Sequence, residues 1–389
     1  MTPELDPDHL RFALSLEDSL AEPAASHVWS PHSAATALSL LAAGASGEVL
    51  AALTRLLAGA GGSLGTHTAA LDAAVSAEAA GEGPPDGWTP PGQEVPPLEL
   101  VSVNDLYVRA GQTVLPGFAA ALAERPSSAV RHADFAGAPE KVRQEINASV
   151  AETTRGMIPD LLPAGSVTAG TRSVLLNALW ARLVWISPFD PENTAERVFH
   201  TPGGDRRVPT MRQTEHFPVA EAAGLRMLTL SGHHGLHLDI VLSGDGAVAA
   251  PVLTAGTYRA LLEARRPERV EVTLPRFRVE SGFELLPLLP GLAAVAGGPG
   301  GDLSGITGDP LQVDAIIHRA VLNVDEVGAE GAAATAVMMV LGAMPQRPRE
   351  FHVDRPFAFV LRRGSAALFL GRITDPEDPG PARTPDPSL

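Results

Sequence analysis

The feature that most constrains the fold is an apolar run near the middle of the chain. Val174 to Trp185 is apolar throughout except for Asn177 and Arg182. A run of this kind, without polar alternation, is typical of a central strand that is buried on both faces of a sheet. Such a sheet needs other elements packed against it, and the chain has 389 residues, of which 45% are hydrophobic. We therefore expect a soluble protein of the α+β class, with mixed sheets.

Periodicity predicts helices and strands in mixed order. Helical spacing of apolar residues predicts helices over 10–20, 32–43 and 138–156, a short helix within 59–97 and a helical segment over 283–289. Other runs predict strands over 98–108, 174–185, 207–211, 225–230, 236–242, 270–274, 316–324, 357–362 and 366–373. Because there is no repeat and no clean linker, we expect one domain over residues 1–376. The Pro-rich tail over 377–389 is expected to be disordered.

A second unusual segment covers residues 329–344. Glu330 is its only charge, no proline precedes Pro345, and its odd-numbered positions up to 341 are all small or apolar. Such a segment can form a strand with one face inside a core, although its composition also permits an Ala-rich surface helix. The context favours the strand, because the segment follows an alternating strand and Gly328. It ends at Pro345 and Pro348, which break both helices and central strands.

The residues from Asp325 to Thr335, DEVGAEGAAAT, closely resemble the hinge of the serpin family of protease inhibitors. Other segments are similar to family motifs in the same order. They are Ser30-Pro-His-Ser33, Asn147 to Ile158, Asn177 to Trp185, Leu274-Pro-Arg-Phe277, Asp302 to Ile306, His318 to Leu322, Arg355 to Phe359 and Leu368 to Arg372. The resemblance covers residues 10–376 and is to inhibitory, bacterial-like intracellular members. It implies a serpin fold with three β-sheets, about eight to nine helices and an exposed reactive-centre loop over 326–350.

The resemblance also implies a mechanism. A target protease attacks the loop as a substrate, and the cleaved loop then enters the central sheet as a new strand and traps the acyl-enzyme irreversibly. Counting from Gly328 places the reactive bond at Gly342–Ala343, with Leu341 and Met344 as neighbouring alternatives. The implied hinge residues are Glu326, Gly328, Ala329, Glu330, Gly331, Ala332, Ala333, Ala334 and Thr335. Ala329 and Gly331 depart from the family pattern, but both are small, so inhibition is favoured over a noninhibitory binding, storage or chaperone-like role.

Further residues resemble the family's control points for sheet opening. Ser30, Ser33, Asn177 and His318 are similar to a polar cluster beneath the sheet, where hydrogen bonds hold two strands together. Trp185 is similar to the tryptophan at the top of the sheet, where the hinge first enters. The plainer interpretation is that each is a buried, hydrogen-bonded polar group or a core aromatic. Both interpretations hold together if these residues pack the part of the sheet that moves.

The reactive loop indicates the class of target. Val340 to Met344 contains no Lys or Arg, which favours an elastase-, subtilisin- or chymotrypsin-like protease over a trypsin-like one. No Lys or Arg occurs between Arg55 and Arg109, so no heparin-type cofactor is expected. The formal net charge of −16 disfavours nucleic acid as a partner. We expect a monomer that binds its protease covalently and needs no cofactor.

Other kinds of function find little support. The sequence offers no G-x-S-x-G nucleophile elbow between a strand and a helix that would support a hydrolase. We therefore do not expect an enzyme. The histidines within Gly232 to Asp239 suggest a metal site, but we interpret them as structural and expect no metal. The first 25 residues show no secretory signal, and no apolar run approaches the ~18 residues of a membrane span. We therefore expect a cytoplasmic protein that does not bind membranes, and export by a route without such a signal is left open.

Overall fold

A computed structural model of the chain describes residues 5–20, 25–76, 99–125, 127–297, 302–308, 311–328 and 347–380. Its α-helices are α1 (Pro7–Leu20), α2 (Pro31–Ala43), α3 (Gly47–Ala58), α4 (Leu64–Val75), α5 (Pro116–Ala123), α6 (Pro139–Thr153), α7 (Ala255–Ala264) and α8 (Pro290–Ala296). None of the helices in these ranges is long and apolar enough to cross a membrane.

Fourteen strands accompany these helices in the described ranges. They are β1 (His27–Trp29), β2 (Glu99–Arg109), β3 (Ser128–Ala133), β4 (Ser173–Arg182), β5 (Ala195–Thr201), β6 (Gly204–Ala222), β7 (Leu225–Ser231), β8 (Leu236–Ser243), β9 (Arg266–Pro275), β10 (Phe277–Glu284), β11 (Ala315–Val324), β12 (Arg349–His352), β13 (Phe357–Arg363) and β14 (Ala366–Ile373). The mixed order of helices and strands confirms the α+β class.

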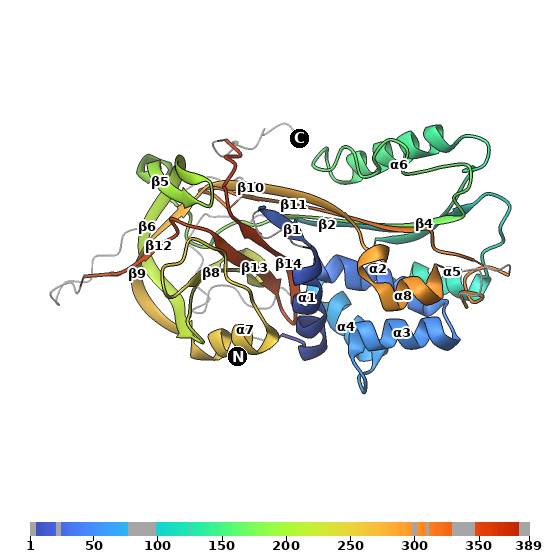
Figure 1. Ribbon diagram of the computed structural model, residues 1–389, viewed down its shortest axis with the longest axis horizontal. Helices are drawn as coiled ribbons and strands as arrows, with labels where there is room; N and C mark the ends of the chain where they lie inside the picture. Colours follow the sequence, from blue (N-terminus) through green and yellow to red (C-terminus); the bar gives the residue numbers. More distant parts are fainter. Residues whose placement is uncertain are drawn as a thin grey trace, which may run out of the picture.

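The central sheet has five strands in the order β10-β11-β4-β2-β3. Its long strands run across the molecule, with α6 on one side and α2 on the other (Figure 1). Within β4, Leu176 and Ala178 belong to the apolar cluster that includes α6, whereas Leu175 belongs to the cluster that includes α2. This confirms the prediction of a central strand buried on both faces, since each face of β4 is covered by a helix.

The other strands form a single sheet of nine, in the order β1-β14-β13-β8-β7-β6-β9-β12, with β5 also paired to β6. The expectation of three separate sheets therefore differs from the hydrogen bonding of the described residues, which joins the strands into two. The reason is β6, which is 19 residues long. It pairs with β5 and β9 along most of its length and with β7 at its end, so the strands remain connected.

Several boundaries depend on tertiary contacts. The predicted helical segment over 283–289 is wrong at its start, because β10 continues to Glu284 through pairing with β11. Only Leu286–Leu288 forms a helical turn, of the 3-10 type. Of the tail expected to be disordered, residues 377–380 are described, and the Arg278 N–H donates to the Glu377 carbonyl at 2.7 Å. Residues 381–389 lie outside the described ranges.

Candidate functional site

The hinge begins where β11 ends. Asp325, Glu326 and Gly328 are described, and they follow Val324, the last residue of β11. The remaining predicted hinge residues, Ala329 to Thr335, and the predicted reactive-bond residues, Leu341 to Met344, lie outside the described residues. The described part of the candidate site therefore consists of residues 325–328 and of the strands β4 and β11 beside them.

The neighbours β4 and β11 run parallel, with Ala315–Val321 paired to Val174–Trp180. A chain that leaves the end of β11 and turns back would run antiparallel to β11. Because β4 is parallel to β11, the same returning chain would be antiparallel to β4 as well. If β4 and β11 separated, one additional strand between them could therefore form antiparallel ladders on both sides.

Trp185, which follows the end of β4, hydrogen-bonds with the hinge. Its backbone N–H donates to the Val327 carbonyl at 3.1 Å, and its indole Nε1 donates to the Asp325 carbonyl at 3.0 Å. The Phe189 N–H donates to the Glu326 carbonyl at 2.8 Å. Trp185 is 2% exposed, so its hydrogen bonds with the hinge are shielded from water. Trp185 therefore lies beside the described part of the hinge.

Gly328 fits this contact because it has no side chain. Its φ is +101°, a conformation that residues with a Cβ rarely adopt. A Cβ at this position would lie 2.3 Å from the Leu183 carbonyl oxygen and 2.7 Å from the Trp185 nitrogen. Any larger residue would push the hinge away from the backbone that holds it.

Glu326 is held by a hydroxyl and a guanidinium. Its side chain is 2% exposed, and its Oε1 accepts a hydrogen bond from Thr194 Oγ1 at 2.6 Å. Arg276 Nη1 lies 3.5 Å from the same oxygen, and Arg276 Nε lies 3.0 Å from Asp378 Oδ1. Since a buried carboxylate needs a compensating charge, Arg276 stabilises the hinge in its present position. Arg276 lies within the Leu274–Phe277 motif, but the sequence alone did not single out either Arg276 or Thr194.

The predicted polar cluster lies halfway along the β4–β11 pair. In the strand register His318 is opposite Asn177, and Asn177 is opposite Asn104 on β2. The His318 Nδ1 and Asn177 Oδ1 atoms are 2.5 Å apart. Asn177 Nδ2 donates to Asn104 Oδ1 at 2.5 Å and to Ser33 Oγ at 2.6 Å. Asn177 therefore connects the three adjacent strands to α2.

Ser30 completes this cluster. The Ser30 N–H donates to His318 Nε2 at 3.0 Å, and the Ser30 hydroxyl accepts from the Ser33 N–H, which caps the start of α2. The structure thus brings together all four residues expected from the sequence, Ser30, Ser33, Asn177 and His318. It adds Asn104, which is 1% exposed. No distinct sequence signal marks Asn104, because its strand also contains Ser102 and Asp105.

His318 is neutral in this cluster. The amide of Asn177 directs its oxygen at His318, so Nδ1 carries the hydrogen and Nε2 accepts from Ser30. Burial lowers the pKa of His318 to about 3, because the charged imidazolium would lose its hydration. A proton on Nε2 would also face the Ser30 N–H instead of accepting from it. The closed arrangement of β4 and β11 therefore requires neutral His318.

The alternative sites are accounted for by structural contacts. Asp239, in the histidine-rich stretch, is fully buried and accepts from Arg362 Nε at 2.7 Å, Tyr258 Oη at 2.5 Å and Thr229 Oγ1 at 2.5 Å. Its carboxylate is therefore occupied by protein donors. Gly61 to Gly65 has the residue pattern G-x-S-x-G, but it connects α3 to α4, and the Ser63 hydroxyl caps α4. No strand therefore presents Ser63 as a hydrolase elbow would.

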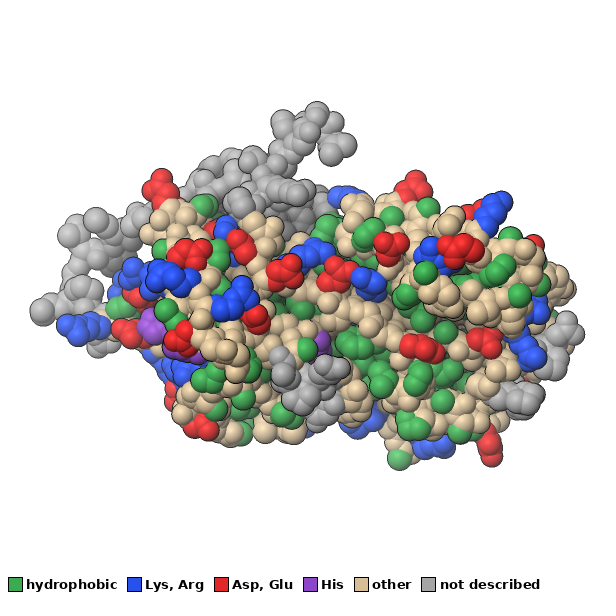
Figure 2. Space-filling model, turned by 45° about the horizontal axis from the view of Figure 1, so that its top comes forward, with side chains coloured by type: hydrophobic (Ala, Val, Ile, Leu, Met, Phe, Trp, Pro, Cys, Tyr) green, Lys and Arg blue, Asp and Glu red, His purple; other side chains and the backbone are tan. Residues whose placement is uncertain are grey.

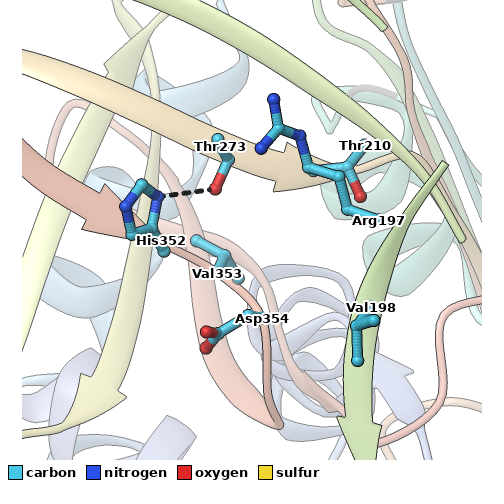
Figure 3. Close-up of a pocket in the computed structure, with 7 residues that line it drawn as sticks. All are labelled: Arg197, Val198, Thr210, Thr273, His352, Val353 and Asp354. Carbon is cyan, nitrogen blue, oxygen red and sulfur yellow. Dashed lines mark hydrogen bonds between the residues drawn. The ribbon is translucent and has the colours of Figure 1, made fainter. Parts of the chain in front are cut away.

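One cavity of about 330 Å³ lies between β5, β6, β9 and β12 (Figure 3). Its lining residues are Arg197, Val198, Thr210, Thr273, His352, Val353 and Asp354, and His352 Nδ1 lies 3.1 Å from Thr273 Oγ1. On the face drawn in Figure 2, basic and acidic side chains of the described residues are interspersed, without a continuous basic tract. None of the residues that line the cavity belongs to β4 or to the described part of the hinge.

Comparisons with known proteins agree with this geometry. Residues 8–376 match the family model described as serpin (serine protease inhibitor). The bovine leukocyte elastase inhibitor is 31% identical over 96% of this chain and 100% of its own length. An uncharacterized serpin-like protein of Thermococcus kodakarensis is 34% identical over 72% of this chain and 68% of its own length. The structure of Serpin48 from the insect Tenebrio molitor superposes with a TM-score of 0.76 at 27% identity, covering 95% of this chain and 96% of that one.

The sequence, the fold and these relatives lead to the same assignment. Some of the motifs quoted from the sequence lie at the described part of the hinge and at the polar cluster, and the family match extends over nearly the whole chain. The chain belongs to the serpin family.

Proposed function

We propose that this serpin is an irreversible suicide-substrate inhibitor of serine-type endopeptidases. The observation that carries the proposal is the parallel pair β4–β11, whose end continues directly into the hinge. A protease would cleave the loop at Gly342–Ala343, and the acyl-enzyme would be trapped as residues 329–342 enter the sheet between β4 and β11. Each molecule of the protein would be cleaved once, as a suicide substrate, and would not turn over as an enzyme does.

The free energy of insertion supports this proposal. Fourteen residues at ~3.3 Å each give a strand of roughly 46 Å. Each new backbone hydrogen bond contributes about 0.5–1.5 kcal/mol net, and the parallel ladder between β4 and β11 would be replaced by two antiparallel ones. Val337, Met339 and Leu341 share one face of the new strand, and each would contribute about 1.5–3 kcal/mol if buried. The intact fold would then be metastable relative to the inserted one.

The composition of the loop supports an elastase-, subtilisin- or chymotrypsin-like target. Gly342 and Leu341 suit small or apolar specificity pockets, and no basic side chain is available for a trypsin-like pocket. The bovine relative is named as an inhibitor of leukocyte elastase, which agrees with the first of these classes. The monomeric state, the cytoplasmic location, the single domain over 1–376 and the absence of a cofactor remain predictions.

Incubation with pancreatic elastase, subtilisin and chymotrypsin tests the proposal. We expect a covalent adduct that survives SDS, and mass spectrometry should show a released C-terminal fragment that begins at Ala343. The matched variant is Ala333→Arg, which places a charge on the inserting face and should convert the inhibitor into a substrate. Cleavage of the wild-type loop without any trapped protease would instead support the noninhibitory, binding or chaperone-like alternative.

A further inference from the structure

A buried carboxylate lies next to the polar cluster but outside it. Glu17, near the end of α1, is 4% exposed. Its Oε1 is 2.7 Å from His27 Nε2, and its Oε2 accepts from Trp29 Nε1 at 2.7 Å. Arg372 Nη2, on β14, is 3.5 Å from Oε1. Glu17 therefore binds both ends of the three-residue strand β1 as well as β14.

The strand β1 leads from Glu17 to His318. The Trp29 ring packs edge-on against the His318 ring, with centroids 6.4 Å apart. The next residue, Ser30, donates its backbone N–H to His318 Nε2. On its other side β1 pairs with β14, where Trp29 is opposite Leu370. Because β1 has only three residues, the Glu17 contacts at both ends fix the position of Trp29 and of the Ser30 N–H.

This geometry connects α1 to the contact that keeps β4 and β11 together. His318 is held on one side by Asn177 and on the other by Trp29 and Ser30. A shift of β1 would move the donor and the ring that orient His318, and the His318–Asn177 contact would weaken. Glu17 does not contact His318 directly, but through Trp29 and Ser30 it can change the free energy of separating β4 from β11.

We propose that Glu17 is a positioning residue for loop insertion, which holds His318 against Asn177 through Trp29 and Ser30 and so keeps β4 and β11 closed. The inference rests on the proposed function, because it concerns the opening of the sheet that the loop would enter. It assigns no contact between Glu17 and the loop or the protease.

Uptake of a synthetic peptide measures this opening directly. The peptide has the sequence of residues 329–342 and is mixed with the intact protein, and its incorporation is followed by mass spectrometry under native conditions. The test variant is Trp29→Phe, which keeps an aromatic ring at this position but removes the indole N–H that donates to Glu17, together with part of the buried ring. We expect uptake about tenfold faster than in the wild type, the effect of losing one charge-assisted hydrogen bond. Glu17→Gln should give a change in the same direction.

The matched control is Tyr258→Phe. It removes one hydroxyl donor from Asp239, another buried carboxylate, which also pairs with an arginine and whose hydrogen-bond partners lie on β7, α7 and β13. A merely structural role for Glu17 predicts equal acceleration in Trp29→Phe and Tyr258→Phe. The positioning role predicts that only Trp29→Phe accelerates uptake. It also predicts that Trp29→Phe has little further effect when it is added to His318→Gln.

The outcomes separate this inference from the proposed function. If the wild type incorporates the peptide and Trp29→Phe behaves like the wild type or like Tyr258→Phe, the positioning role is wrong and the proposed function stands. If the wild type takes up no peptide even on mild heating, the sheet does not expand and both proposals are overturned.

Discussion

Acidification should weaken the closed sheet through His318. Burial lowers the pKa of this histidine to about 3, whereas the imidazole of an unfolded chain titrates near pH 6.5. The folded pKa is the lower one, so the unfolded chain binds the proton first as the pH falls. The stabilising contribution of neutral His318 is thus complete above pH 6.5 and is lost progressively between pH 6.5 and about pH 3.

The size of the effect follows from the two pKa values. One pH unit within this interval changes the free energy of unfolding by about 1.4 kcal/mol for one group. Between pH 8 and pH 5 the loss from His318 is about 2 kcal/mol. Burial lowers the pKa of His9 to about 3 and those of His32 and His237 to about 4, so all three act in the same direction. The contribution of His318 must therefore be isolated by difference.

The assay is urea unfolding of the intact protein at pH 8 and pH 5, for the wild type and for His318→Gln. Glutamine retains an oxygen that can accept from the Ser30 N–H but does not titrate, and the other histidines are present in both proteins. The stability advantage of the wild type over the variant should shrink by about 2 kcal/mol at pH 5. An advantage that stays the same within about 0.5 kcal/mol at both pH values would refute the reasoning.

Three further substitutions test the hinge and the polar cluster. Gly328→Ala places a Cβ against the Leu183 carbonyl and should destabilise the intact protein by about 1–3 kcal/mol; differential scanning calorimetry should show a lower Tm for the intact form and a smaller change for the loop-cleaved form. Arg276→Gln leaves Glu326 without its cation and should speed loop-mediated polymerisation on mild heating, as followed by native gel electrophoresis. Adding Glu326→Gln should restore part of the loss, and a double variant no better than Arg276→Gln would contradict the ion-pair argument. Asn177→Ala removes the amide that joins three strands to α2 and should cost about 2–4 kcal/mol in urea unfolding; a loss below about 0.5 kcal/mol would mean that the cluster does not hold the sheet closed.

Much of the fold could be predicted because the spacing of apolar residues along the chain indicates which side chains are buried. The apolar run that became β4 and the helical spacing that became α2 each needed only their own residues. Short elements were missed where local signals are weak, such as α8 with seven residues and β1 with three. The segment over 283–289 was wrong because its helical spacing was overridden by pairing of β10 with β11, which no local pattern encodes.

The sequence by itself identified candidate residues for the hinge and the polar cluster, because Gly328, Trp185, Asn177 and His318 lie in motifs that can be recognised in order along the chain. Only the tertiary structure decided how they act. Asn177 meets His318 from 141 residues away and Asn104 from 73, and Arg276 joins Glu326 to Asp378. Glu17 has no motif to mark it, and its relation to His318 exists only because β1 packs between them. The physical reason is that periodicity reports whether a side chain is buried, whereas its partner is chosen by the pairing of strands and helices distant in the sequence.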